Sequence, residues 1–222
     1  ETGKDISLGN SWKADVIIDK SYPENQNLEN YRDFALYFQD EDNILGTSFM
    51  PYLQNVAGLT GVNYRLEPWT YREDEGCELG NMFTACVAAD GDPATPILKA
   101  HAGDRVMVNI FGAHNEQNQM FNMDGHQWRR HLNQEGSDMI DVQQFGGGEY
   151  IQAFVNAGGT YSNPGTYLWL NSRTPYQQAG QWGYFKVLPA GERSILPLGG
   201  AAPKAGKTAA KGVGDDVLSM NR

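Results

Sequence analysis

Residues 32–39 constrain the fold of this chain strongly, because large apolar side chains recur there at every second position. Phe34, Leu36 and Phe38 would share one face of a β-strand, since successive side chains of a strand point to opposite sides. Short runs of aromatic and β-branched residues recur downstream, glycine is frequent at 26 residues, and no long stretch follows a helical period. The pattern predicts an all-β protein with many turns.

The same criteria predict further strands along the chain, at residues 98–111, 119–128, 141–145 and 149–155. The last two are separated by Gly146, Gly147 and Gly148, where backbone freedom is high and a turn is expected. Aromatic residues recur on the expected core strands and are assigned to packing: Trp128, Tyr167, Trp169, Trp182 and Phe185. A carbohydrate-binding β-sandwich would show a similar aromatic content.

Size and charge exclude several classes of protein. The chain has 222 residues with 40% hydrophobic content, which suits one large domain better than two. Its formal net charge of -10 argues against a nucleic-acid partner, because neutralising phosphates requires a basic face. No apolar run approaches the ~20 residues needed to cross a bilayer, so we expect no membrane insertion.

Composition divides the chain into three regions: an N-terminal extended arm (1–30), a core domain (31–190) and a C-terminal tail (191–222). Within the arm, residues 7–19 are expected to be extended. They either pair with a neighbouring domain or subunit or form an edge strand of the chain's own sheet. The tail is rich in Gly, Ala and Pro and too poor in aromatic residues to form a core of its own, so we expect low complexity there.

Residues 121–128 resemble a core strand of multicopper oxidases and their ceruloplasmin-like relatives. In those proteins the equivalent run reads approximately His-x-x-His-x-His-Gly-His, and its first three imidazoles bind copper. Here those three places hold Gln119, Asn122 and Asp124, and only the last, normally non-ligating histidine remains, as His126. The resemblance therefore implies the fold of this family with its copper ligands substituted.

The downstream half of the resemblance lies at residues 163–169 and 180–187, which follow the family's closing pattern of a Pro-Gly turn, a strand, a loop and a last strand. In a copper-bearing domain the strand after the turn carries a His-Cys-His cluster, with a further histidine and a methionine close behind. Residues 168–172 offer Leu, Trp, Leu, Asn and Ser instead, and no cysteine follows Cys86. A blue-copper thiolate site cannot be assembled from this region.

The upstream half agrees with this interpretation. Residues 31–40 resemble the first core strand of ceruloplasmin-like domains, 61–65 a strand that follows it, and 96–111 the paired-strand entry of cupredoxin domains. The similarity covers roughly residues 33–188. It implies an all-β, cupredoxin-like Greek-key β-sandwich or barrel. The family that the chain resembles is that of the large multi-domain multicopper oxidases.

The two cysteines, Cys77 and Cys86, lie in one loop-like segment. In an exported protein, as the resemblance implies, we expect them to form a local disulfide, which stabilises by about 2 kcal/mol. The alternative is two unpaired thiols in a reducing compartment. Because the chain begins at Glu1 without an initiator methionine, we expect a processed or excised chain that is secreted, periplasmic or extracellular.

Metal binding by this chain has only weak candidates. A two-histidine site of His114 and His126 at a domain boundary is one hypothesis, but hydrogen-bonding histidines are the favoured interpretation, and no metal is expected. Calcium is a second hypothesis, because acidic clusters supply oxygen ligands; its candidates are Asp40, Asp42, Glu73 and Asp74. Neither cluster has the spacing of an EF-hand loop.

Catalysis has no candidate residues. The sequence contains no Gly-x-Ser-x-Gly motif, no nucleophile placed beside a histidine and no phosphate-binding loop. We therefore expect no catalytic residue and no activity of the chain alone, although a parent assembly would be a multicopper oxidase.

Three functional hypotheses follow. The leading one is a non-catalytic cupredoxin-like domain or subunit of a secreted multicopper-oxidase-like assembly, with a scaffold and interface role and copper in partner domains. The second is a structural module of an extracellular homopolymer or surface layer, built by strand exchange between copies of the chain. The third is a copper oxidase chain with unusual ligands. Partners are expected to be other cupredoxin domains or copies of the chain itself.

Overall fold

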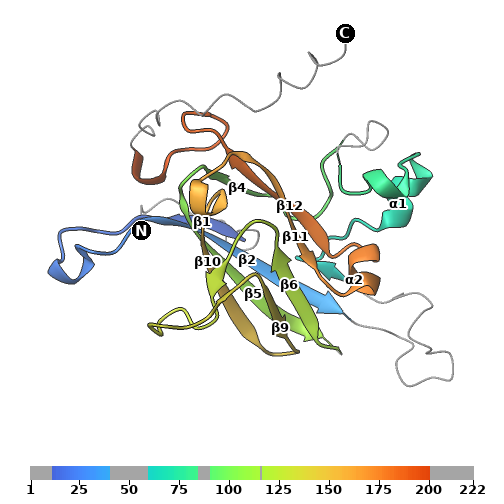
Figure 1. Cartoon of the computed structure of the whole chain (residues 1–222), viewed down its shortest axis with the longest axis horizontal. Helices are drawn as coiled ribbons and strands as arrows, with labels where there is room; N and C mark the ends of the chain where they lie inside the picture. Colours follow the sequence, from blue (N-terminus) through green and yellow to red (C-terminus); the bar gives the residue numbers. More distant parts are fainter. Residues whose placement is uncertain (1–11, 41–59, 85–90, 116, 201–222) are drawn as a thin grey trace, which may run out of the picture.

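The computed structural model describes residues 12–40, 60–84, 91–115 and 117–200, and this part of the chain forms a β-sandwich (Figure 1). The first sheet consists of β1 (Lys13–Val16), β2 (Tyr31–Asp40), β3 (Gly61–Val62), β5 (Arg105–Asn115) and β10 (Tyr150–Asn156). The second sheet consists of β4 (Leu98–His101), β6 (Gln119–Met123), β9 (Val142–Phe145), β11 (Gly165–Asn171) and β12 (Trp182–Leu188). A small separate hairpin pairs β7 (Trp128–Arg129) with β8 (Met139–Ile140).

Helical segments are short. The two α-helices are α1 (Trp69–Asp74) and α2 (Thr174–Gln178), and the 3₁₀ turns are η1 (Pro23–Asn25), η2 (Leu79–Asn81), η4 (Gly159–Tyr161) and η5 (Leu198–Gly200). None of these described helices has the length and apolar character needed to cross a membrane. The helices lie in connections between strands, and the sheets form the body of the protein.

The strand connections cross repeatedly between the two sheets. Within the first sheet the order is β1-β2-β5-β10, with β3 also paired to β2, and within the second it is β4-β12-β11-β6-β9. β2 runs parallel to β5 and β4 runs parallel to β12, whereas the other pairs are antiparallel. Neighbouring strands such as β5 and β10 are separated in sequence by strands of the opposite sheet, which is Greek-key connectivity. The predicted all-β Greek-key β-sandwich is confirmed.

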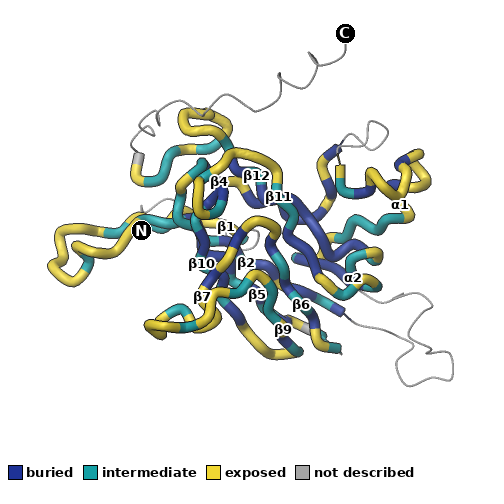
Figure 2. Tube along the Cα trace, in the orientation of Figure 1, coloured by how far each residue is buried: buried dark blue, intermediate teal, exposed yellow. Residues whose placement is uncertain are grey.

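The core lies between the facing sides of the two sheets. Phe34, Leu36 and Phe38 of β2 are all buried, as their alternation predicts. The Phe38 ring packs edge-on against Trp169 of the second sheet at 6.2 Å and against Phe145 at 5.3 Å between ring centres. Buried segments run through both sheets in Figure 2. The predicted packing role of the aromatic residues is confirmed, because Trp128, Trp169, Trp182 and Phe185 are fully buried and Tyr167 packs against the core.

Two predicted strands are each divided by a turn. Residues 98–111 form β4 and the start of β5, as the resemblance to a paired-strand entry predicts, and the turn between them contains Gly103 at a positive φ of 86°. Residues 119–128 end as a strand at Met123, because Gly125 has a φ of 69°, which starts a turn. His126 and His131 both lie outside the strands.

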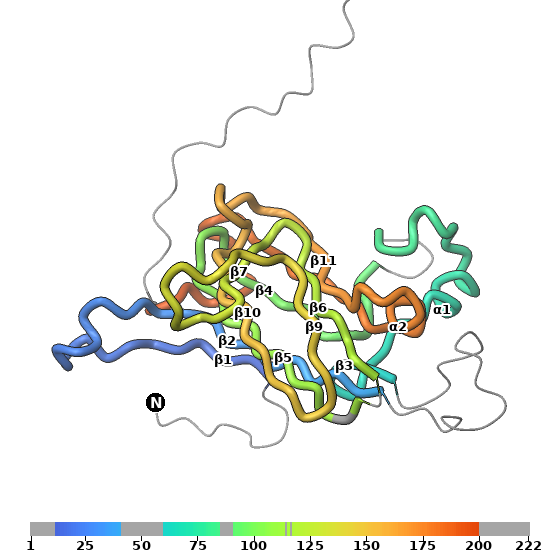
Figure 3. The backbone as a smooth tube through the Cα atoms, turned by 60° about the horizontal axis from the view of Figure 1, so that its bottom comes forward, coloured from blue at the N-terminus to red at the C-terminus, as the bar shows by residue number. Residues whose placement is uncertain are grey.

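The N-terminal region contributes an edge strand to the first sheet. β1 pairs antiparallel with β2, so residues 13–16 of the expected arm pair within the chain's own sheet. Residues 17–30 form a connection that projects from the body in Figures 1 and 3, and Lys20 donates hydrogen bonds from Nζ to the Asn25 and Gln26 carbonyls, each at 3.0 Å. Residues 7–11 lie outside the described part of the chain.

A buried arginine joins the arm, the body and the start of the tail. Arg32 is 4% exposed and pairs with Asp104 at 2.7 Å and with Asp15 of β1 at 2.9 Å. Its third donor reaches the Leu196 carbonyl at 2.7 Å. This set of bonds compensates the desolvation of the guanidinium group, because a buried charge is stable only when it is paired. Residues 201–222 of the expected tail lie outside the described part.

Candidate functional site

The three positions that the resemblance assigns to copper ligands lie on two different sides of β6. Gln119 points into the sandwich and is completely buried, together with Phe121 and Met123 on the same face of the strand. Asn122 and Asp124 point outward, because side chains alternate along a strand. The structure therefore contains two separate sites, an outer cavity and a buried polar cluster.

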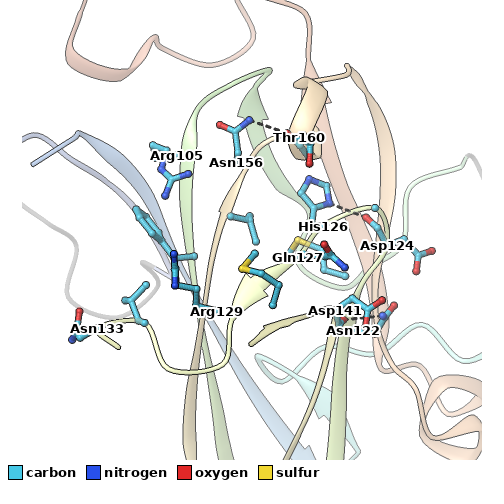
Figure 4. A pocket seen from close by; sticks show the side chains of 17 residues that line it. Arg105, Asn122, Asp124, His126, Gln127, Arg129, Asn133, Asp141, Asn156 and Thr160 are labelled. Atoms are coloured by element: carbon cyan, nitrogen blue, oxygen red, sulfur yellow. Dashed lines mark hydrogen bonds between the residues drawn. The ribbon is translucent and has the colours of Figure 1, made fainter. Parts of the chain in front are cut away.

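The outer cavity has a volume of about 950 Å³ and opens where the turn after β6 meets the end of β10 and η4. Figure 4 shows Arg105 and Arg129 on one side of it and Asp124 and Asp141 on the other. Asn122 is held in place there, because its side-chain amide donates to the Asp141 carbonyl at 3.0 Å. Among the residues that line this cavity His126 is the only histidine, so imidazoles do not converge in it.

Both ring nitrogens of His126 are engaged in hydrogen bonds. Nε2 accepts the backbone N–H of Gly158 at 3.0 Å, so the proton is assigned to Nδ1, which donates to the Asp124 carbonyl at 2.7 Å. The ring is 1% exposed and packs against Tyr167 and Phe185, with ring centres 4.7 and 5.0 Å away. His126 thus fastens the turn after β6 to the turn after β10, and neither nitrogen is available to a metal.

Burial also changes the acid–base behaviour of this turn. It lowers the pKa of His126 from the ordinary 6.5, against the opposing effect of the hydrogen bond to the Asp124 backbone and the Asp124 charge. Burial raises the pKa of the Asp124 carboxyl, and the neighbouring His126 acts in the opposite direction. The folded protein therefore favours the neutral imidazole.

The predicted pair of His114 and His126 is not brought together by the backbone. His114 lies opposite Gln39 near the end of β5, on the side where the chain enters β6. His126 follows the far end of β6, and five strand residues span about 16 Å. The side chain of His114 lies outside the described part of the structure.

The other two histidines have different surroundings. His101 is buried, and its Nε2 donates to the Glu192 carbonyl at 2.7 Å while Arg32 reaches Nδ1 at 3.3 Å. His131 is exposed in the loop after β7. Among the described residues no group of three or more His, Cys, Asp or Glu side chains could hold a metal ion.

Five polar side chains meet in the interior at one end of the sandwich, and we name them the buried amide network: Asp40, Gln119, Asn171, Tyr176 and Gln181. All are between 0% and 3% exposed. They come from the end of β2, the start of β6, the end of β11, α2 and the residue before β12. Residues far apart in sequence therefore share one enclosed polar volume, where each group must find its partner inside the protein.

Asn171 is at the centre of this network. Its Nδ2 donates to the Oε1 atoms of Gln181, at 2.6 Å, and of Gln119. Its Oδ1 accepts the backbone N–H groups of Arg173 at 3.0 Å and Met120 at 3.3 Å. Both side-chain donors and the side-chain acceptor of Asn171 are thus used within the protein.

Asp40 accepts hydrogen bonds from two other members of the network. Its Oδ2 accepts Gln119 Nε2 at 2.9 Å and the Tyr176 hydroxyl at 2.8 Å. Burial, and then the hydrogen bond to the Asp40 carboxylate, raise the pKa of Tyr176 above its usual value, so the phenol stays protonated and donates. Gln181 in turn donates from Nε2 to the backbone carbonyl of Gln39 at 3.0 Å.

The calcium and disulfide hypotheses stay predictions. Asp40 belongs to the buried amide network and Asp42 lies outside the described residues, whereas Glu73 and Asp74 are exposed on α1. Cys77 is 6% exposed, and its expected partner Cys86 lies outside the described residues.

Sequence reasoning missed Tyr176 and Gln181 and gave Asp40 a different role. The sequence does contain one indication of a buried polar cluster, because Gln119 and Asn171 are amides on strands whose other inward residues are apolar. A polar side chain at an inward strand position needs a buried partner. The sequence does not say which residues supply it.

No protein-family model and no curated protein sequence matches this chain. Solved structures that resemble it include the multicopper oxidase mgLAC, with 16% identity and a TM-score of 0.43 over 72% of this chain and 44% of that one. The multi-copper oxidase from Pediococcus acidilactici gives 7% identity and a TM-score of 0.44 over 78% of this chain and 28% of that one.

A copper nitrite reductase from Nitrosomonas europaea gives 14% identity and a TM-score of 0.36 over 42% of this chain and 33% of that one. The chain spans less than half the length of these three proteins. The fold and the site described above follow from the chain's own strands and side chains.

The lowered pKa of His126 predicts a specific pH dependence of stability. As the pH falls below 6.5 the unfolded chain takes up a proton at this residue before the folded chain does, so the free energy of unfolding falls until the pH passes the lowered pKa of the folded state. The loss is up to about 1.4 kcal/mol per pH unit from this residue. Urea unfolding at several pH values should show a smaller loss for His126→Gln than for the wild type. Equal pH dependences would contradict the assignment, and His131→Gln, at an exposed position, is the matched control.

The central role of Asn171 predicts a large effect of an isosteric change. Asn171→Asp replaces two N–H donors by a carboxylate that faces the Oε1 atoms of Gln119 and Gln181. We expect a loss of about 3 kcal/mol in the free energy of unfolding, measured by urea titration. Asn122→Asp is the control, because the Asn122 hydrogen bond is exposed, and it should cost less than about 1 kcal/mol. Similar losses for the two variants would contradict the network.

Proposed function

We propose that the chain is a non-catalytic cupredoxin-like domain or subunit of a secreted multicopper-oxidase-like assembly, in which it serves as scaffold and interface. One observation carries this proposal. The positions that the resemblance assigns to copper ligands hold amide and carboxylate residues, the two amides are hydrogen-bonded within the protein, and the remaining histidine of the motif has both nitrogens bonded. Copper in such an assembly belongs to partner domains.

The donor set at these positions does not fit a copper centre. Blue copper is bound by two imidazoles and a thiolate with a weak axial thioether, and amide side chains are poor substitutes for these soft and borderline ligands. A metal at Gln119 or Asn171 would also have to break hydrogen bonds that are enclosed in the interior. This supports a domain that keeps the fold without the redox chemistry.

The outer face of the first sheet supports the interface role. Tyr37 of β2, Phe111 of β5 and Tyr150 of β10 stack across three strands, with ring centres 4.7 and 4.9 Å apart. Tyr37 is 41% exposed and Tyr150 is 48% exposed. The solvent face of a two-layer sandwich is usually polar, and a continuous aromatic row there is typical of a docking surface. We propose that another cupredoxin-like domain or a second copy of the chain covers this aromatic row.

A structural homopolymer built by strand exchange is the second candidate function. It is favoured by β1, which in the described part of the chain pairs only with β2 and so offers an edge to an incoming strand. In such a polymer the contact would be made by backbone hydrogen bonds along β1, and the aromatic row would be dispensable.

Metal analysis and native mass measurement of the full chain test the proposal together. After incubation with excess Cu²⁺ and desalting, we expect substoichiometric copper, whereas a full copper ion per wild-type chain would contradict a non-catalytic role.

Tyr37→Ser with Tyr150→Ser should abolish association in native mass spectra. The matched control is Tyr71→Ser with Tyr161→Ser, which changes tyrosines that are 59% and 84% exposed elsewhere. Association that survives loss of the aromatic row would favour strand exchange.

A further inference from the structure

We infer that the outer cavity is a binding site for an acidic saccharide. Arg105 and Arg129 hold the carboxylate of the sugar, and the carboxylates and amides on the opposite side of the cavity hold its hydroxyl groups. The cavity volume of about 950 Å³ lies in the range of ligand-binding clefts. The scaffold role proposed above does not use this cavity, so the inference goes beyond that role and is independent of it.

The arginine side of the cavity has hydrogen-bond donors that the protein leaves unused. The guanidinium carbon of Arg105 lies 4.3 Å from the centre of the Phe154 ring, which covers one face of the group and orients it. Arg105 Nε is 3.4 Å from a carboxylate oxygen of the exposed Glu29 but makes no hydrogen bond in the described part of the chain. No described residue forms a hydrogen bond or ion pair with the side chain of Arg129 on β7. Two guanidinium groups are therefore available to an anion.

The opposite side of the cavity offers hydrogen-bond acceptors. Asp124 and Asp141 contribute carboxylates that accept no hydrogen bond from any described residue. Asn122 donates to the Asp141 carbonyl at 3.0 Å, so its amide is oriented and its Oδ1 is left as an acceptor. Asn156, which also lines the cavity, uses its amide donors in two bonds of 2.9 Å within its own turn and likewise retains Oδ1. These oxygens can accept the protons of several hydroxyl groups.

The charges of the cavity are separated and unpaired. Among the described residues no ion pair joins the arginines on one side to the aspartates on the other, although all four line the same cavity. The two arginines and two aspartates cancel in charge, within a chain whose formal net charge is -10. A ligand with negative charge on every side would meet the aspartates, and a hydrocarbon would leave all four charges without partners. The lining suits a ligand that is anionic on one side and carries neutral donors on the other.

An acidic sugar has this distribution of groups. Its carboxylate can accept the two parallel hydrogen bonds that a guanidinium group donates. Its hydroxyl groups donate to carboxylate and amide oxygens. Leu132, Met139 and Phe154 add apolar surface to the lining, and Met139 is 54% exposed. The C–H face of a sugar ring can cover this apolar surface, whereas a small inorganic anion cannot.

The cavity is shaped before a ligand binds. Its lining comes from the turn after β6 and from the end of β10 with η4, and His126 bonds these segments together through the Asp124 carbonyl at 2.7 Å and the Gly158 N–H at 3.0 Å. Segments that are already fixed lose little conformational entropy on binding, which favours affinity.

The test is a titration of the full chain with the trisaccharide of galacturonic acid, followed by calorimetry and by NMR shifts of the backbone amides. We expect one trisaccharide per chain, with the largest shifts at Gly125 and Gly159, which line the cavity. The methyl ester of the same trisaccharide keeps the hydroxyl groups and loses the charge, so it should bind about tenfold more weakly. Glycylglycine carries both charges without hydroxyl groups and should not compete.

Matched variants test the two sides of the cavity separately. Arg129→Gln should weaken binding of the trisaccharide about tenfold, and Arg130→Gln, at the next and exposed position outside the lining, should leave it unchanged. Asp141→Ala should also weaken binding, because it removes acceptors for hydroxyl groups, with Asp138→Ala as its control. A site that only attracts anions would instead bind more tightly after Asp141→Ala.

Absence of binding to the wild-type chain, or shifts that lie away from the cavity, would overturn the inference without any variant. Equal binding of the acid and its ester, equal effects of Arg129→Gln and Arg130→Gln, tighter binding by Asp141→Ala or competition by glycylglycine would overturn it as well. Failure here leaves the proposed function untouched, because that proposal is decided by copper content and by native mass.

Discussion

The interior at one end of this sandwich is polar, and the structure depends on every group there finding a partner inside the protein. Asp40, Gln119, Asn171, Tyr176 and Gln181 are shielded from water, so a missing bond would cost the full desolvation of the group left behind. Asn171 satisfies two glutamines at once, and Asp40 satisfies a glutamine and a phenol. Two strands of the second sheet, the long strand of the first and the connection from α2 to β12 are thereby fixed to each other.

The sequence could predict the sheets because their signal is local. The alternation of Phe34, Leu36 and Phe38 and the aromatic residues of the closing strands lie within single elements. The division of residues 119–128 was missed, because a strand pattern does not reveal that Gly125 turns the chain at a positive φ. Membership of the buried amide network was missed for another reason, since Gln119 and Asp40 are 79 residues apart and Tyr176 and Asp40 are 136 apart.

The two ends of β6 have different roles. At its start, Gln119 enters the closed polar interior, and after its end, His126 fastens two turns beside a cavity of about 950 Å³ that carries charges of both signs. Neither arrangement leaves imidazole or thiolate groups converging on a metal, and both hold backbone segments in place. The aromatic row on the first sheet is the other unusual surface, because three stacked rings lie on a face that normally meets water. These features are the observations from which the scaffold role was proposed.

The central claim is that the side-chain amides of the buried amide network are hydrogen-bonded within the wild-type protein. Hydrogen exchange of the side-chain amides, followed by NMR with and without Cu²⁺, tests it most directly. Engaged amides predict slow exchange for the side chains of Gln119, Asn171 and Gln181 and no selective broadening of these signals by the paramagnetic ion. Rapid exchange, or broadening confined to these three residues, would contradict the account.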